Sequence, residues 1–188
     1  MSAMKRVFPL FLVASLLTVV ASCVGSRNPA SDEKTSKIDE RLIGEWNVDG
    51  DSVWKATKSK DVENALDVDA PKPKGPGHVL VFATTIKSQG YLSIINVKDK
   101  KSKEASYLIC RYEFSDNDTV NIRFMKPKAL AKAIQEKQII GEMVKKDNDK
   151  KDTPVITDTP EGIARYLEAH ADECFTGKNE VLTCKRRK

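Results

Sequence analysis

Two segments in the middle of the chain, His78-Val79-Leu80-Val81-Phe82-Ala83-Thr84 and Tyr91-Leu92-Ser93-Ile94-Ile95-Asn96-Val97, are rich in β-branched and aromatic residues. Such residues favour strands, and Ser88-Gln89-Gly90 between the two segments predicts a turn. Two more strands are predicted at residues 105–114 and 119–124, the second of which alternates apolar and polar residues as half-buried antiparallel strands do. These four consecutive strands predict an antiparallel meander.

The segments before the meander predict two short strands and a long loop. Residues 44–48 and 53–57 are the strand candidates, with Gly50-Asp51-Ser52 turning the chain between them. Residues 58–78 are polar and end in Pro71-Lys72-Pro73-Lys74-Gly75-Pro76-Gly77, which suits neither a helix nor a sheet ladder. This part of the chain is therefore predicted to be a surface loop.

The segments after the meander predict two helices. Residues 128–137 are strong helix formers, and Asp158-Thr159-Pro160-Glu161 supplies the start signals of a second helix that extends to about residue 172. Short strands are predicted at residues 139–144, 155–157 and 180–185. The expected fold is therefore mainly β, a β-rich α+β domain built as an antiparallel meander with two helices.

The N-terminus has the organisation of an export signal. Lys5 and Arg6 precede an apolar run at residues 7–20, and small residues follow it. The run is shorter than the roughly 20 residues that a membrane-spanning helix needs. Residues 1–22 are therefore predicted to be a signal peptide.

The end of this signal, Val20-Ala21-Ser22-Cys23, resembles the lipobox of bacterial lipoproteins. The resemblance implies cleavage before Cys23, acylation of that cysteine, for example with palmitate, and a mature protein anchored to a membrane. In Gram-negative members, Asp after the acylated cysteine favours the inner membrane. Val24 stands there, which implies the outer membrane, with the domain facing the periplasm. An ordinary signal-peptidase site that leaves Cys23 unacylated is the alternative.

The remaining chain divides into a spacer and a domain. Residues 23–37 are small and polar, so they are predicted to be the acylated N-terminus and a flexible spacer. Residues 38–188 are expected to form a single β-rich domain, because about 150 residues suffice for one core. No apolar run in this part is long enough to cross a bilayer.

The start of the domain, Gly44-Glu45-Trp46, resembles the Gly-x-Trp entry strand of lipocalin-like barrels. In that family the glycine permits a tight entry and the tryptophan plugs one end of the barrel. The resemblance therefore implies a lipocalin-like barrel as the alternative to the meander, with Gly44 and Trp46 packed at a barrel end. It also implies that an arginine stacks on Trp46, for which Arg186 and Arg187 are both candidates.

The chain contains four cysteines, and three remain if Cys23 carries lipid. Cys174 and Cys184 flank a polar turn at residues 176–179 and are the best-placed pair for a disulfide. Cys110 lies on the apolar face of a predicted strand and is expected to be a small buried thiol. Three thiols cannot all pair within one chain.

No catalytic or metal-binding motif is visible. The chain has two histidines, His78 and His170, and lacks the clustered ligands that a metal site needs. An enzyme, a cofactor and a metal are therefore not expected. Loss of Lys5 and Arg6 from the 32 basic residues, against 27 acidic ones, leaves a charge of about +3, too small to indicate a nucleic-acid partner.

The expected function is that of an envelope lipoprotein that binds a small apolar ligand or a lipid, which would enter near the loop at residues 58–77. A structural or assembly lipoprotein that docks on another envelope protein is the alternative.

Overall fold

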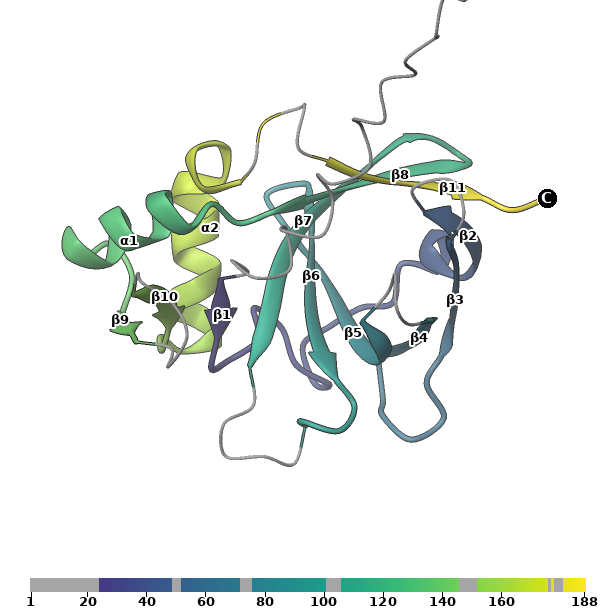
Figure 1. The fold of residues 1–188 in the computed structure, drawn as a ribbon, viewed down its shortest axis with the longest axis horizontal. Coiled ribbons are helices and arrows are strands. Elements are labelled where there is room, and N and C mark those ends of the chain that lie inside the picture. Colours follow the sequence, from purple (N-terminus) through teal and green to yellow (C-terminus); the bar gives the residue numbers. More distant parts are fainter. Residues whose placement is uncertain are drawn as a thin grey trace, which may run out of the picture.

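Eight antiparallel strands close into a barrel, and Figure 1 looks into the ring that they form. The computed structural model describes residues 24–48, 52–71, 76–100, 106–145, 152–175, 177 and 181–188. The barrel strands are β2 (Gly44–Val48), β3 (Ser52–Lys58), β4 (Leu66–Ala70), β5 (Gly77–Ile86), β6 (Gln89–Asn96), β7 (Tyr107–Asp116), β8 (Thr119–Phe124) and β11 (Val181–Arg186). Each strand from β2 to β8 pairs with the next, and β11 closes the barrel between β8 and β2.

The strand register separates the barrel interior from its outer surface. Leu92 lies opposite both Ala83 and Cys110, and all three side chains pack in one cluster inside the barrel. Directly opposed residues share a face of the sheet, so their neighbours along each strand point outward. The β5–β6 hairpin turns at Lys87 and Ser88, which both have positive φ angles, as the favoured two-residue hairpin turns require.

An insertion between β8 and β11 lies against the outside of the barrel, on the left of Figure 1. It consists of α1 (Pro127–Gln135), β9 (Gly141–Val144), β10 (Thr153–Ile156) and α2 (Pro160–Cys174). Both helices begin with a proline at the first helical position, which suits that position because its N–H has no partner within the helix. Thr159 caps α2, since its Oγ1 accepts a hydrogen bond from Gly162 N at 3.1 Å.

A short N-terminal strand, β1 (Gly25–Ser26), joins the insertion to the barrel. β8 ends at Phe124, opposite Cys110, and β1 pairs with β7 further along, at Leu108 and Tyr107. The other edge of β1 pairs in parallel with β10, which pairs with β9. The sheet therefore continues from the barrel wall into the insertion.

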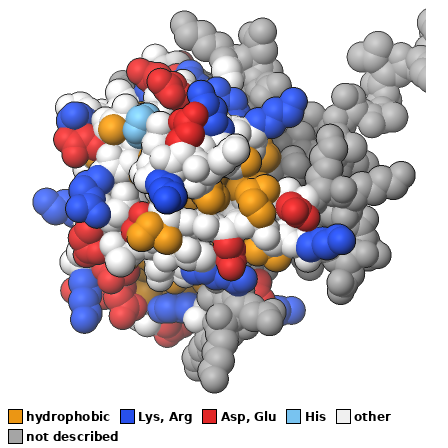
Figure 2. All heavy atoms as spheres, turned by 90° about the vertical axis from the view of Figure 1, so that its left-hand side faces the viewer, with side chains coloured by type: hydrophobic (Ala, Val, Ile, Leu, Met, Phe, Trp, Pro, Cys, Tyr) orange, Lys and Arg blue, Asp and Glu red, His pale blue; other side chains and the backbone are white. Residues whose placement is uncertain are grey.

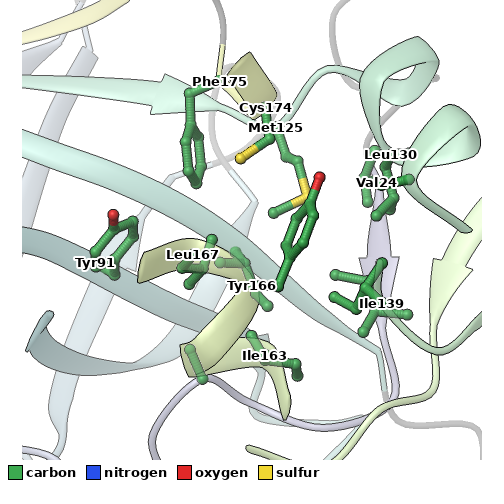
Figure 3. Close-up of a cluster of buried hydrophobic side chains, with 14 residues drawn as sticks. Val24, Tyr91, Met125, Leu130, Ile139, Ile163, Tyr166, Leu167, Cys174 and Phe175 are labelled. Carbon is green, nitrogen blue, oxygen red and sulfur yellow. The ribbon is translucent and has the colours of Figure 1, made fainter. Parts of the chain in front are cut away.

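The hydrophobic residues form two main cores. The inner core fills the barrel. The outer core lies between the barrel wall and the insertion. Figure 3 shows its side chains and labels Val24, Tyr91, Met125, Leu130, Ile139, Ile163, Tyr166, Leu167, Cys174 and Phe175. A small cluster around Leu80, Phe82 and Ile95 covers part of the remaining wall. The insertion is thus attached to the barrel through a shared core.

The predicted fold class is confirmed, because the chain is mainly β and closes into an antiparallel barrel with two helices. The predicted loop at residues 58–78 differs from the structure, since it contains β4. The alternation in β4 gives it only a narrow apolar face, Leu66, Val68 and Ala70, between polar residues. None of the helices in the described part of the chain is long and apolar enough to span a membrane.

The predicted flexible spacer also differs from the structure. Within residues 24–37, Val24, Ala30, Ser31 and Ser36 are buried. Ala30 N donates a hydrogen bond to Ser93 Oγ at 2.9 Å. The prediction of a flexible spacer is therefore wrong for residues 24–37, which form part of the folded domain.

Candidate functional site

One end of the barrel is closed by the residues that precede β2. They form the 3-10 turn η2 (Glu40–Leu42), and the indole Nε1 of Trp46 donates a hydrogen bond to Leu42 O at 2.9 Å. Trp46 is buried, and the guanidinium of Arg186 lies 4.4 Å from its ring centroid. An arginine over a tryptophan face adds a cation–π attraction to the packing. Of the two candidate arginines, Arg186 is the one that stacks on Trp46.

Gly44 allows Arg186 to take this position. The two terminal nitrogens of Arg186 donate hydrogen bonds to Ile43 O at 2.9 Å and to Arg41 O at 2.6 Å. A Cβ atom at position 44 would lie 2.6 Å from Arg186 Nη1, and Gly44 has a φ of +140°, which side chains disfavour. The structure therefore places both Gly44 and Trp46 at the closed end of the barrel.

A polar network completes the closed end. The Tyr112 hydroxyl donates to Asp39 Oδ2 at 2.9 Å, and the Arg41 guanidinium donates to both oxygens of the same carboxylate. Burial tends to raise the pKa of Asp39, but the hydrogen bonds from Arg41 and Tyr112 outweigh it and hold that pKa below its usual value. Arg41 also lies over the Phe114 ring at 4.4 Å. These contacts cover this end of the barrel, and both carboxylate oxygens of Asp39 accept hydrogen bonds there.

The middle of the barrel is filled by side chains. Ten of the inward-facing residues are at most 8% exposed: Val48, Leu66, Val79, Val81, Ala83, Leu92, Cys110, Val120, Ile122 and Cys184. Side chains buried to this extent pack against one another in the inner core. The partly exposed side chains of the inner core therefore lie towards the two ends of the barrel, of which η2 covers one; we call the other the open end.

That open end carries a ring of apolar side chains, which we call the mouth residues. They are Trp54, Val68, Ile94, Leu108, Phe124 and Leu182, one each from β3, β4, β6, β7, β8 and β11. Their register partners are inward-facing residues; Phe124 lies opposite Cys110, and Leu182 lies opposite Ile122. All six pack on the inner core but remain partly exposed. Among the described residues, the mouth is thus an end of the barrel at which apolar side chains of the inner core are partly exposed.

The cysteines do not pair as predicted. Cys174 is a free thiol in the outer core, and its Sγ donates a hydrogen bond to His170 O at 2.9 Å. Burial raises the pKa of Cys174 to about 11, which disfavours the reactive thiolate. Cys184 points into the inner core. The predicted disulfide is wrong because the two side chains belong to different cores.

Each histidine lies beside one carboxylate among the described residues, and for His170 this is Glu173, whose Oε2 is 4.0 Å from Nδ1. His78 Nε2 lies 3.1 Å from Asp67 Oδ1 on an exposed surface. His170 packs on Tyr166, with ring centroids 5.1 Å apart, at a kink in α2. The described residues contain no group of three or more His, Cys, Asp or Glu side chains that could hold a metal ion.

The predicted lipidation site, Cys23, lies outside the described residues, as does Val20-Ala21-Ser22. The residue that follows it is placed, however. Val24 is 3% exposed and packs in the outer core, close to Leu130 and Ile139 (Figure 3). Val24, the residue that follows Cys23, is therefore part of the folded domain.

In comparisons with known proteins, no protein-family model, no curated protein and no solved structure matches the chain.

Proposed function

We propose that the chain is an envelope lipoprotein, anchored through acylated Cys23, that binds a small apolar ligand or a lipid at the mouth of its barrel. The ring of mouth residues is the observation that carries the binding proposal. Ligand sites are typically concave and mostly apolar, and this barrel has one sealed end and one end at which six apolar side chains remain accessible. Because the interior behind them is packed, the ligand inserts at the mouth and does not cross the barrel.

The anchoring proposal rests on the sequence Val20-Ala21-Ser22-Cys23. Each buried methylene of an acyl chain contributes about 0.8 kcal/mol, so one chain holds a protein marginally and two or more hold it firmly. We propose that the anchor lies in the outer membrane and that the domain faces the periplasm.

Replacing Cys23 with serine is expected to abolish both acylation and membrane association. Metabolic labelling with palmitate measures the first, and the protein fraction that sediments with membranes measures the second. Lys34→Ser is the matched control, because Lys34 is an exposed residue of the same segment. Equal labelling of the wild type and Cys23→Ser would contradict acylation at Cys23.

Introducing a charge among the mouth residues is expected to weaken apolar binding. Ile94→Glu places a carboxylate where an apolar probe would pack, and burying that charge without a partner is costly. The neutral fluorophore N-phenyl-1-naphthylamine is a suitable probe, and its affinity should fall by about tenfold or more, which corresponds to 1.4 kcal/mol or more. Ile140→Glu is the control, because Ile140 is 65% exposed on the insertion. Absence of saturable binding by the wild type, or an equal loss in both variants, would refute a mouth site.

One observation favours the alternative, docking on another envelope protein. Among the described strands β9 pairs only with β10, and Met143 on β9 and Ile140 just before it are among the most exposed large hydrophobic residues of the described chain. Figure 2 shows the face that carries the insertion, where small apolar patches lie between charges of both signs. Native mass spectrometry distinguishes the two functions: co-purifying small molecules favour ligand binding, whereas a stable protein partner favours docking.

A further inference from the structure

Two arginines lie side by side on the outer surface of the barrel. Arg111 of β7 and Arg123 of β8 are direct cross-strand partners, and their side chains are only 12% and 15% exposed. Like charges in this arrangement repel each other, so each guanidinium requires a negative neighbour. Arg111 Nη1 lies 2.9 Å from Asp172 Oδ1 on α2, and Arg123 Nη2 lies 2.5 Å from Glu113 Oε1.

The two carboxylates are much more exposed than the arginines that they neutralise. The side chain of Asp172 is 94% exposed and that of Glu113 is 41% exposed. Ion pairs with exposed partners contribute little to stability, so a competing anion can displace Asp172 at small cost. In addition, the buried Nε atoms of Arg111 and Arg123 have no hydrogen-bond partner in the described part of the protein, although buried donors are normally satisfied. The pair therefore retains two unused hydrogen-bond donors beside its two carboxylates.

A cavity of about 490 Å³ opens over the arginine pair. Besides the four charged side chains, Lys126, Ala171, Phe175 and Gly177 line it. Within the described residues Lys126 forms no ion pair, so three cations face two carboxylates. The volume is that of a small-molecule site. Ala171 and Phe175, which is only 3% exposed, give one wall a small apolar surface. We call this cavity the outer-wall pocket.

We propose that the outer-wall pocket binds a small organic anion. A carboxylate or phosphate group of the ligand pairs with Arg111, Arg123 and Lys126, because guanidinium groups bind both oxyanions through paired hydrogen bonds. The apolar part of the ligand packs on Ala171 and on the small exposed part of Phe175. The pocket is on the outside of the barrel, so this site is distinct from the mouth and does not depend on acylation of Cys23.

The experiment is an NMR titration of the full chain, labelled with nitrogen-15, using benzoate, phenyl phosphate and acetate as probes. We expect benzoate or phenyl phosphate to shift the Gly177 amide and the Nε–H signals of both arginines saturably. Acetate should bind about fivefold more weakly than benzoate, because it lacks the ring that packs on the apolar wall of the pocket. The aromatic anion that binds more tightly shows whether the pocket prefers a carboxylate or a phosphate group.

The variants distinguish binding in the outer-wall pocket from nonspecific attraction between the anionic probes and basic residues of the surface. Arg123→Gln should lower the affinity for the tighter-binding probe by about tenfold, and Lys126→Gln should lower it by about threefold. Lys128→Gln is the matched control, since Lys128 is an exposed lysine of α1 that does not line the pocket, and it should leave the affinity unchanged. If the NMR signals of Arg123→Gln are poorly dispersed, the variant is unfolded, and the comparison of Lys126→Gln with Lys128→Gln decides the outcome. The proposal is overturned if neither aromatic anion binds saturably or if the two lysine variants weaken binding equally.

Discussion

Replacing Trp46 with alanine is expected to lower the free energy of unfolding by about 3–5 kcal/mol, the usual cost of truncating a buried aromatic residue. Trp46 is 5% exposed and is contacted on one face by Arg186. Its loss removes the hydrogen bond to Leu42 O and leaves a cavity beneath η2. The closed end of the barrel would then lose both its plug and the group that holds Arg186.

Urea denaturation followed by circular dichroism measures this effect. Trp54→Ala is the matched control, because Trp54 lies directly opposite Trp46 but is only partly buried. Its truncation should cost less than half as much. Each variant keeps one of the two tryptophans of the chain, so fluorescence provides a second probe. Equal costs, or a cost below about 1 kcal/mol for Trp46→Ala, would show that the plug does not stabilise the barrel.

Removing residues 24–36 is expected to destabilise the domain by about 3–6 kcal/mol, which a flexible spacer would not do. The deletion withdraws Val24 and Ala30 from the outer core and exposes the apolar residues beneath them. It also removes the hydrogen bonds from Arg27 N to Ile156 O and from Ala30 N to Ser93 Oγ. The measurement compares the urea midpoint of a chain that starts at Val24 with that of a chain that starts at Lys37.

Point variants test the same segment without shortening it. Val24→Asp places an unpaired charge in the outer core and should cost about 3 kcal/mol or more. Lys34→Asp changes an exposed residue of the same segment and should stay within about 0.5 kcal/mol. Equal midpoints for the two truncated chains would mean that the segment does not contribute to the fold.

The central meander was predictable because most of its buried side chains are apolar and its β5–β6 and β7–β8 turns are short. The N-terminal segment was not, because serines occupy many of its buried positions. Ser26, Ser31 and Ser36 are at most 4% exposed. Ser26 and Ser36 are accommodated through hydrogen bonds of their hydroxyl groups to backbone carbonyls. Composition therefore indicates a solvated spacer where tertiary contacts in fact bury small polar residues.

The sites depend even more on tertiary structure. Gly44 and Trp46 were found through a local motif, whereas the mouth residues come from six strands and form a ring only after the barrel closes. Arg123 alternates with apolar neighbours, which marks it as outward-facing. Its position beside Arg111, however, requires the register of β7 and β8, and Asp172 comes from the insertion. Local spacing also cannot reveal that Cys174 and Cys184 belong to different cores.

The burial of Val24 limits how far an anchored domain can reach. A free linker over residues 23–37 would let it range up to about 50 Å from the bilayer. With Val24 fixed in the outer core, acylation of Cys23 would instead hold the barrel against the headgroups. The anchored domain would then meet other membrane-bound molecules by lateral diffusion in the membrane plane. Its ligands would have to bind and dissociate close to the lipid surface.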